Sequence, residues 1–253
     1  MNSPFITIAR SSSYLIIRLS RPEKSNPLSQ EMILALREIF ESLDSEPKLR
    51  AVILTGTGEE AFCAGSEITE LARAEKRELF EDLFTQIESC HVPVIAAVNG
   101  IANGDGCELA LSCHLRIASV NARFSLPGPK PGIINGDAPA RRLAREVGEE
   151  RALEMLSGKA VSAEEALRLG LINQAVPAVE LLARAEGLAG EIAELAPLAI
   201  RACLEAVTRG TQLPLAEGLA LEGRLFASLF DTDDVREGTS AFLEKRSPVF
   251  KGT

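Results

Sequence analysis

The chain has 253 residues, of which 46% are hydrophobic and 25% charged, and its formal net charge is −9. This composition is that of a globular protein, and a chain of this length buries a large core without needing disulfides or bound metals to stabilise it. The acidic balance disfavours a nucleic-acid partner, because phosphate binding needs a basic face. The five cysteines show no Cys-x-x-Cys spacing and the two histidines lie in no cluster of ligands, so we expect reduced thiols and no metal site. No secretory signal or membrane-spanning run is recognisable, so we expect a cytoplasmic protein without membrane contact.

The first hundred residues alternate between strand and helix patterns. The β-prone run Tyr14–Leu19 predicts a strand, and apolar residues at helical spacing across 28–43 predict an amphipathic helix. Apolar runs at 51–55 and 93–98 predict strands buried on both faces, with a second long helix at 68–90 between them. This order predicts an α/β core with right-handed crossovers.

The pattern becomes almost entirely helical after residue 148. Residues 162–165 read Ser-Ala-Glu-Glu, a capping box that opens a helix. We divide the chain into a core at residues 1–195 and a C-terminal helical region at residues 196–253.

Two glycine-rich loops, at residues 61–68 and 99–110, run directly into predicted helices. Glycine lets a backbone approach a ligand closely, and the first turn of a helix leaves N–H groups unpaired. Two such loops that meet would offer two N–H donors to one oxygen, which is the arrangement of an oxyanion hole. Either loop taken alone is equally typical of an ordinary turn.

Six segments occur in an order and spacing that is informative together. They lie at residues 21–28, 56–68, 93–100, 104–110, 167–172 and 233–250. Through them the chain resembles the enoyl-CoA hydratase/isomerase (crotonase) superfamily over residues 12–251. The resemblance implies a spiral of ββα units with a C-terminal region that forms a homotrimer or a dimer of trimers. It also implies an acyl-CoA thioester as substrate, with coenzyme A part of the substrate and no separate cofactor.

The resemblance also implies roles for individual residues. By motif position, the backbone N–H groups of Ser66 and Asp105 would bind the thioester oxygen and stabilise an enolate. Glu108 matches the first of two glutamates that act as acid and base. The alternative is that Glu108 is an ordinary surface residue of the helix. The residues implied to contact coenzyme A are Lys24, Ser25, Asn26, Ala64, Ser66, Glu67, Ile68, Lys245 and Phe250, the last two from a neighbouring subunit.

Three positions bear on the family pattern in this chain. Asp105 replaces the middle residue of a glycine triplet, so its carboxylate must point away from the oxyanion. Gly128 stands where the second glutamate is expected, and glycine cannot transfer a proton. Asp137 is a candidate substitute, with the capping of the following helix as an equal alternative.

We therefore expect an acyl-CoA-binding enzyme of the hydratase/isomerase type that uses Glu108 as acid or base. Gly128 leaves two alternatives open. One is an acyl-CoA decarboxylase or C–C hydrolase, in which one proton donor can suffice, and the other is a catalytically inactive CoA-binding homologue. A nicotinamide oxidoreductase is disfavoured, because residues 104–106 lack the third glycine and the later acidic residue of a dinucleotide site.

Overall fold

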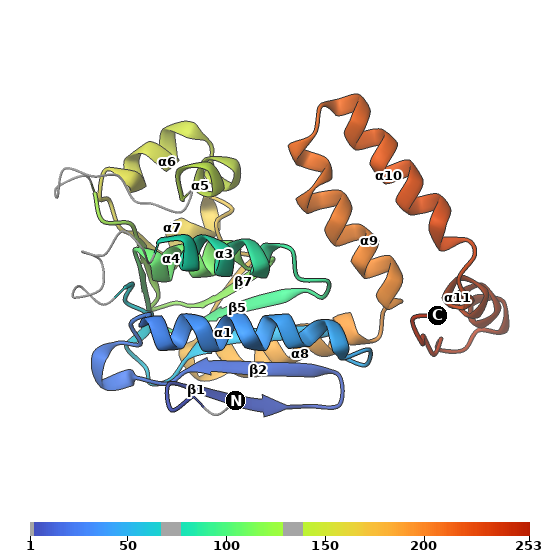
Figure 1. The fold of residues 1–253 in the computed structure, drawn as a ribbon, viewed down its shortest axis with the longest axis horizontal. Coiled ribbons are helices and arrows are strands. Elements are labelled where there is room, and N and C mark those ends of the chain that lie inside the picture. The colour runs from blue at the N-terminus through green and yellow to red at the C-terminus, as the bar shows by residue number, and fades with distance from the viewer. Residues whose placement is uncertain (1–2, 67–76, 129–138) are drawn as a thin grey trace.

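The computed structural model describes residues 3–66, 77–128 and 139–253 and has an α/β architecture (Figure 1). Its main sheet has six strands in the order β1-β2-β3-β5-β7-β10. The β1–β2 pair is antiparallel and the other pairs are parallel. The strands are β1 (Ile6–Arg10), β2 (Tyr14–Leu19), β3 (Ala51–Gly56), β5 (Val94–Val98), β7 (Leu115–Ser119) and β10 (Gln174–Val176). The predicted strands at 14–19, 51–55 and 93–98 are confirmed.

Helices cover both faces of this sheet, so alternate residues of one strand enter different layers. Leu54 and its neighbours pack with α1 (Gln30–Ser42) and the described part of α3 (Arg77–Glu88). Ile53 and its neighbours pack against α8 (Leu181–Ala193). Burial on both sides explains why the strands are apolar throughout. The predicted first helix is confirmed as α1, and part of the second lies outside the described residues.

A second, four-stranded sheet has the order β4-β6-β8-β9. Its strands are β4 (Ala61–Cys63), β6 (Ile101–Asn103), β8 (Arg123–Ser125) and β9 (Val161–Ser162). Chain order shows a repeat: β5 in the main sheet is followed by β6 in the small sheet and then by α4 (Asp105–Ser112). β3 and β4, and β7 and β8, alternate between the sheets in the same way. The ββα spiral is therefore present, although strands of two or three residues gave no periodic signal in the sequence.

The remaining helices follow the third repeat. They are α5 (Pro139–Val147), α6 (Glu149–Leu156), α7 (Ala163–Arg168), α9 (Pro197–Thr208), α10 (Leu215–Leu229) and α11 (Asp233–Glu244). The 3-10 helices are η1 (Pro22–Lys24), η2 (Leu43–Ser45), η4 (Ala178–Glu180) and η5 (Gly210–Gln212). Ser162 caps α7 by accepting from the Glu165 N–H at 3.2 Å, which confirms the serine half of the capping box.

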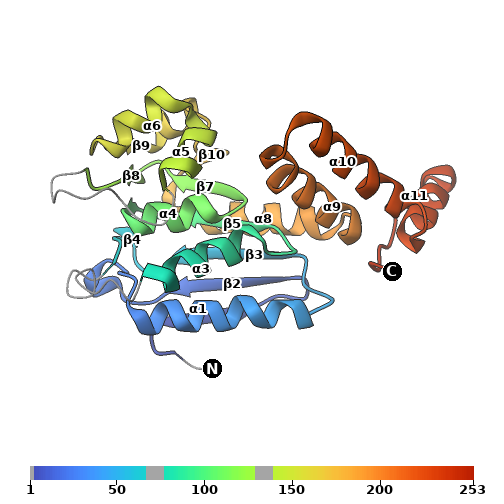
Figure 2. The same ribbon diagram turned by 45° about the horizontal axis from the view of Figure 1, so that its top comes forward.

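Helices α9, α10 and α11 form a C-terminal arm that extends away from the sheets in both views (Figures 1 and 2). The last helix that packs on the main sheet is α8, which ends at Ala193. The domain division at residue 195 stays a prediction. Among the described residues, no helix combines the length and apolar character that a membrane span needs.

Candidate active site

The glycine-rich loops after β4 and β6 lie against each other. These strands are parallel neighbours, so the loops leave adjacent carboxyl ends. Gly65 has a φ of +101°, and a Cβ there would lie 2.9 Å from the Asn103 carbonyl oxygen. A Cβ at Gly106 would lie 2.1 Å from the Cys63 carbonyl oxygen. Only glycine allows this close approach, and the meeting of the two loops is the first requirement of the predicted site.

Asn103 ties these loops to the next strand of the small sheet. Its Nδ2 donates to the Ala64 carbonyl oxygen at 3.2 Å, and its Oδ1 accepts from the Ser125 hydroxyl at 2.8 Å. The Gly104 N–H donates to the Ser125 carbonyl oxygen at 2.9 Å. Three consecutive repeats are thus joined through one amide. The sequence analysis gave Asn103 no role, because its partners are distant in the chain.

Ser66 and Asp105, the residues predicted to supply the N–H donors, are brought into contact. Asp105 is the first residue of α4, where backbone N–H groups have no acceptor within the helix. The Ser66 hydroxyl donates a hydrogen bond to the Asp105 carboxylate. The carboxylate therefore has a fixed partner on the opposite loop, which limits where its negative charge can point.

Glu108 lies one turn further along α4 and is almost fully buried, with 1% of its surface exposed. Its Oε1 accepts a hydrogen bond from Arg142 Nη1 at 2.5 Å. The same guanidinium on α5 donates to both carboxylate oxygens of Glu88, from Nε at 2.6 Å and from Nη2 at 3.1 Å. Burial acts to lower the pKa of Arg142, but Glu88 and then Glu108 more than offset it and raise the pKa. Glu108 is therefore a buried, ion-paired carboxylate and not a surface residue.

Arg142 is, with Asn103, a residue of this site to which the sequence analysis gave no role. In the sequence it stands among other arginines, beside Arg141 and near Arg145. A salt-bridge partner 34 positions away in the chain leaves no local signal.

Gly128 lies next to this site and has no room for a side chain. A Cβ on Gly104 would lie 3.4 Å from Pro127, so the strand end that carries Gly128 borders the α4 loop. A Cβ on Gly128 itself would lie 2.7 Å from the Ser157 carbonyl oxygen and 3.2 Å from the Gly158 nitrogen. The turn after α6 therefore occupies the space where a second glutamate would begin.

A family model described as enoyl-CoA hydratase/isomerase matches residues 9–253. The chain belongs to the enoyl-CoA hydratase/isomerase family. The short-chain-enoyl-CoA hydratase of Clostridium acetobutylicum is 36% identical to it, and the match covers 95% of each chain. The crotonyl-CoA hydratase of Syntrophomonas wolfei is 36% identical, with 97% of each chain covered. The crystal structure of an enoyl-CoA hydratase from Bacillus anthracis matches with a TM-score of 0.95 at 36% identity, covering 98% of this chain and 100% of that one. The crotonase-type fold is confirmed.

The turn that the family resemblance links to coenzyme A lies beside the first loop of the site. The Ala64 N–H donates to the Ser25 carbonyl oxygen at 3.0 Å. Ser25 is half-buried in a left-handed conformation with φ of 63°, and Lys24 is exposed. Lys24, Ser25 and Ala64 are therefore adjacent to the loops, and their contact with coenzyme A stays a prediction.

Asn26 has a fully buried side chain that is hydrogen-bonded to the backbone of its own chain. Its Oδ1 accepts from the Arg21 N–H at 2.8 Å, and its Nδ2 donates to the carbonyl oxygens of Thr57 at 2.9 Å and Ala61 at 2.8 Å. The amide holds the turn against β3 and β4. Asn26 therefore supports this part of the enoyl-CoA hydratase/isomerase fold, and contact of its turn with coenzyme A stays a prediction.

The other predicted residues fall in two groups. Glu67, Ile68 and Asp137 lie outside the described residues. Lys245 ends α11 in a left-handed conformation and Phe250 packs beside Gly238 of the same helix. Both lie on the C-terminal arm, away from α4 of their own chain (Figure 1). A role for them at the site of a neighbouring subunit stays a prediction.

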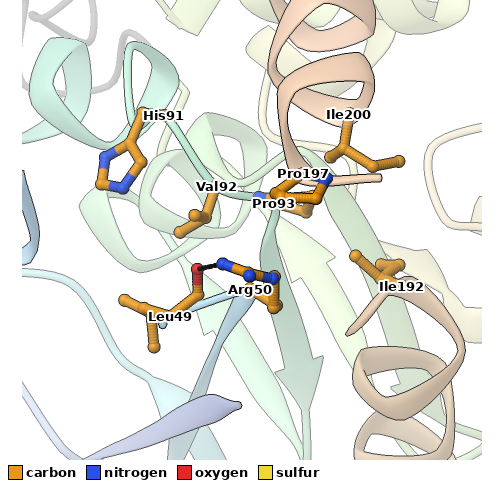
Figure 3. Close-up of a pocket in the computed structure, with 8 residues that line it drawn as sticks. All are labelled: Leu49, Arg50, His91, Val92, Pro93, Ile192, Pro197 and Ile200. Atoms are coloured by element: carbon orange, nitrogen blue, oxygen red, sulfur yellow. Dashed lines mark hydrogen bonds between the residues drawn. The ribbon is translucent and has the colours of Figure 1, made fainter. Parts of the chain in front are cut away.

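A pocket between the main sheet and the arm is separate from this site (Figure 3). Arg50 and Pro93 line it at the amino ends of β3 and β5, with Pro197 from α9. The candidate active site lies past the carboxyl ends of the same strands. The cavity volume of about 10 Å³ holds no more than one water molecule, so it is not a substrate site.

Proposed function

We propose that this chain binds an acyl-CoA thioester and stabilises its enolate in an oxyanion hole formed by the Ser66 and Asp105 N–H groups. Glu108 acts as the acid or base. The observation that carries the proposal is the contact between Ser66 and Asp105, with a buried Glu108 one turn along the same helix. The hydratases among its relatives support enoyl-CoA thioesters as the substrate class.

In hydration, the oxygen of water bonds to the β-carbon while Glu108 accepts the proton that water releases. The electron pair of the double bond moves to the thioester oxygen, and the N–H groups stabilise that charge. The α-carbon then takes up a proton. Gly128 stands at the second position, so Glu108 is the one of the two expected carboxylates that this chain has. The proton that Glu108 takes from water is therefore the one that it can return to the α-carbon.

The closed environment of Gly128 favours a second candidate, decarboxylation or C–C cleavage of an acyl-CoA. Decarboxylation generates the enolate as CO₂ leaves, so a single proton donor can complete it. C–C hydrolysis also adds water to the carbonyl carbon that is cleaved off, and Glu108 accepts the proton of that water and returns it to the enolate. The catalytically inactive CoA-binding homologue is the outcome in which ligand binds and no thioester is turned over.

Calorimetric titration with acetoacetyl-CoA, whose enolate form mimics the proposed intermediate, tests the binding part of the proposal. We expect saturable binding in the micromolar range and none with free acetoacetate, because recognition includes the nucleotide. Absence of heat and of thermal stabilisation with acetoacetyl-CoA at millimolar concentration would contradict it.

Glu108→Gln tests the catalytic part. The amide keeps the shape of the side chain but cannot accept a proton, so we expect turnover to fall by about 10² to 10⁴-fold, while affinity for acetoacetyl-CoA changes little. Crotonyl-CoA, malonyl-CoA and a β-ketoacyl-CoA serve as substrates, and Glu164→Gln on the exposed first turn of α7 is the control. Equal activity of wild type and Glu108→Gln on every substrate would refute the role of Glu108.

We further propose that the chain works as a homotrimer or a dimer of trimers in the cytoplasm, without a separate cofactor. Apolar side chains exposed on the C-terminal arm support the assembly.

A further inference from the structure

Arg142 connects three helices around Glu108. It comes from α5, Glu108 from α4 and Glu88 from the end of α3. The guanidinium makes two hydrogen bonds to Glu88 and one to Glu108, at distances between 2.5 and 3.1 Å. Its central carbon lies 5.7 Å from the centre of the Phe84 ring, within the range of a cation–π contact.

The burial of the three side chains is graded. The exposed fraction of the side chain is 39% for Glu88, 10% for Arg142 and 1% for Glu108. An ionised carboxylate as buried as Glu108 is costly unless a cation compensates it. Arg142 supplies that charge in a fixed orientation, because Glu88 and Phe84 hold the guanidinium from the other side.

The other titratable groups on α4 and β4, within the described part of the chain, do not supply a positive charge. On α4 they are Asp105, which adds a negative charge one turn away, and Cys107. From β4 the nearest is Cys63. Burial raises the pKa of both thiols to about 12, so they are neutral at physiological pH.

The remaining elements around α4 contribute Glu88 from α3 and Arg116 from β7. Glu88 is a second negative charge. Arg116 is paired with Glu146 at 2.7 Å and donates to the carbonyl oxygens of Leu111 and Cys113 at the end of α4. Among the residues that the structure describes, Arg142 is therefore a cation in direct contact with the Glu108 carboxylate.

We infer that Arg142 is a positioning residue that keeps Glu108 ionised and oriented, so that Glu108 enters each turnover as a base. The inference rests on the proposed function and narrows it. An ionised Glu108 has no proton to give to a carbanion at the start of a reaction, whereas it can accept one from water or from an α-carbon. The ion pair therefore favours hydration or double-bond isomerisation over decarboxylation.

The pH dependence of kcat/KM for crotonyl-CoA tests this in Arg142→Gln, Arg142→Lys and the control Arg145→Gln. Arg145 lies on the same helix but is exposed, and it donates to the Thr211 hydroxyl at 2.6 Å. Loss of the positive charge disfavours ionised Glu108, so the acidic limb of the profile should move up by about one pH unit or more in Arg142→Gln. Activity at neutral pH should fall by about 10-fold or more. In Arg142→Lys, which keeps the positive charge, both the shift of the acidic limb and the loss of activity should be smaller. Arg145→Gln should match wild type.

Urea unfolding at fixed protein concentration gives a second readout that does not depend on activity. Arg142→Gln and Glu108→Gln are combined in a double-mutant cycle at pH 8. We expect the urea concentration at the unfolding midpoint to fall by less in the double variant than the two falls of the single variants added together, because the groups interact. Additive losses would overturn the inference, as would an unshifted acidic limb in a folded Arg142→Gln variant.

The two proposals can fail separately. If wild type and Glu108→Gln turn over crotonyl-CoA equally, the proposed function fails, and the urea cycle still reports whether Arg142 and Glu108 are coupled. If activity depends on Glu108 but the pH profile of kcat/KM is the same in wild type and Arg142→Gln, the proposed function stands and the inference is wrong.

Discussion

Asp105 places a carboxylate at a position where the proposed chemistry develops negative charge. The Ser66 hydroxyl donates a hydrogen bond to that carboxylate, so the orientation of the Asp105 side chain is coupled to Ser66 on the opposite loop. A hydrogen bond to a charged acceptor contributes about 1.5–3 kcal/mol, which is enough to favour one side-chain orientation strongly. Ser66 and Asp105, one on each loop of the site, therefore act as a pair.

This coupling predicts the outcome of Ser66→Ala. Removing the hydroxyl releases the Asp105 carboxylate, which can then turn toward the enolate, so kcat should fall by about 10-fold. Asp105→Gly in the same chain removes the charge and keeps the backbone N–H, and it should restore most of the activity. Steady-state kinetics of the single and double variants with the best CoA thioester measure this. A double variant no better than Ser66→Ala would show that the pairing does not matter.

At the scale of elements, the turn between α6 and β9 decides what position 128 can hold. A Cβ at residue 128 would lie 2.7 Å from the Ser157 carbonyl oxygen, which is too close for two atoms that are not bonded. Backbone atoms cannot move aside as a flexible side chain can. The loss of the second glutamate is thus accompanied by closure of its space.

Gly128→Ala should consequently destabilise the protein by about 1–3 kcal/mol, as an overpacked interior position does. Gly190→Ala on α8 is the matched control, because a Cβ there meets nothing within 4 Å, and it should be neutral or slightly stabilising. Gly128→Glu should be at least as destabilised as Gly128→Ala and should not gain crotonyl-CoA hydration. Urea unfolding and a hydration assay measure the two effects, and a stable Gly128→Glu with raised hydration would contradict the crowding.

At the scale of the whole molecule, the C-terminal arm exposes large apolar side chains. They include Leu215 and Phe226 on α10 and its C-cap residue Phe230, with 78%, 65% and 60% of their surfaces exposed. On α11, Phe242 is 83% exposed. Large exposed apolar groups gathered on neighbouring helices mark association surfaces, so we predict that the arm holds the subunits together.

Light scattering should therefore give the mass of a trimer or a hexamer. Phe226→Glu combined with Phe242→Glu should lower that mass, because charges at a buried contact are costly. Val179→Glu is the control, since Val179 is 92% exposed but lies on η4, outside the arm. A wild-type mass that stays monomeric at every concentration would rule out this assembly.

Three strands of the main sheet and the family could be predicted from the sequence. Continuous apolar runs mark strands buried on both faces, and β2, β3 and β5 formed where those runs occur. The motifs at residues 56–68 and 104–110, which carry the resemblance to the family, gave the Ser66, Asp105 and Glu108 positions. These features are local, because a strand pattern or a helix start is written in consecutive residues.

The tertiary structure alone decided which groups pair. Ser66 and Asp105 are 39 positions apart, and Glu108 and Arg142 are 34 apart. Neither pairing leaves a trace in local composition. The small sheet escaped detection because strands of two or three residues have no measurable alternation. The burial of the Asn26 amide could not be predicted from the sequence either, since burial depends on what folds over a residue and not on its neighbours in the chain.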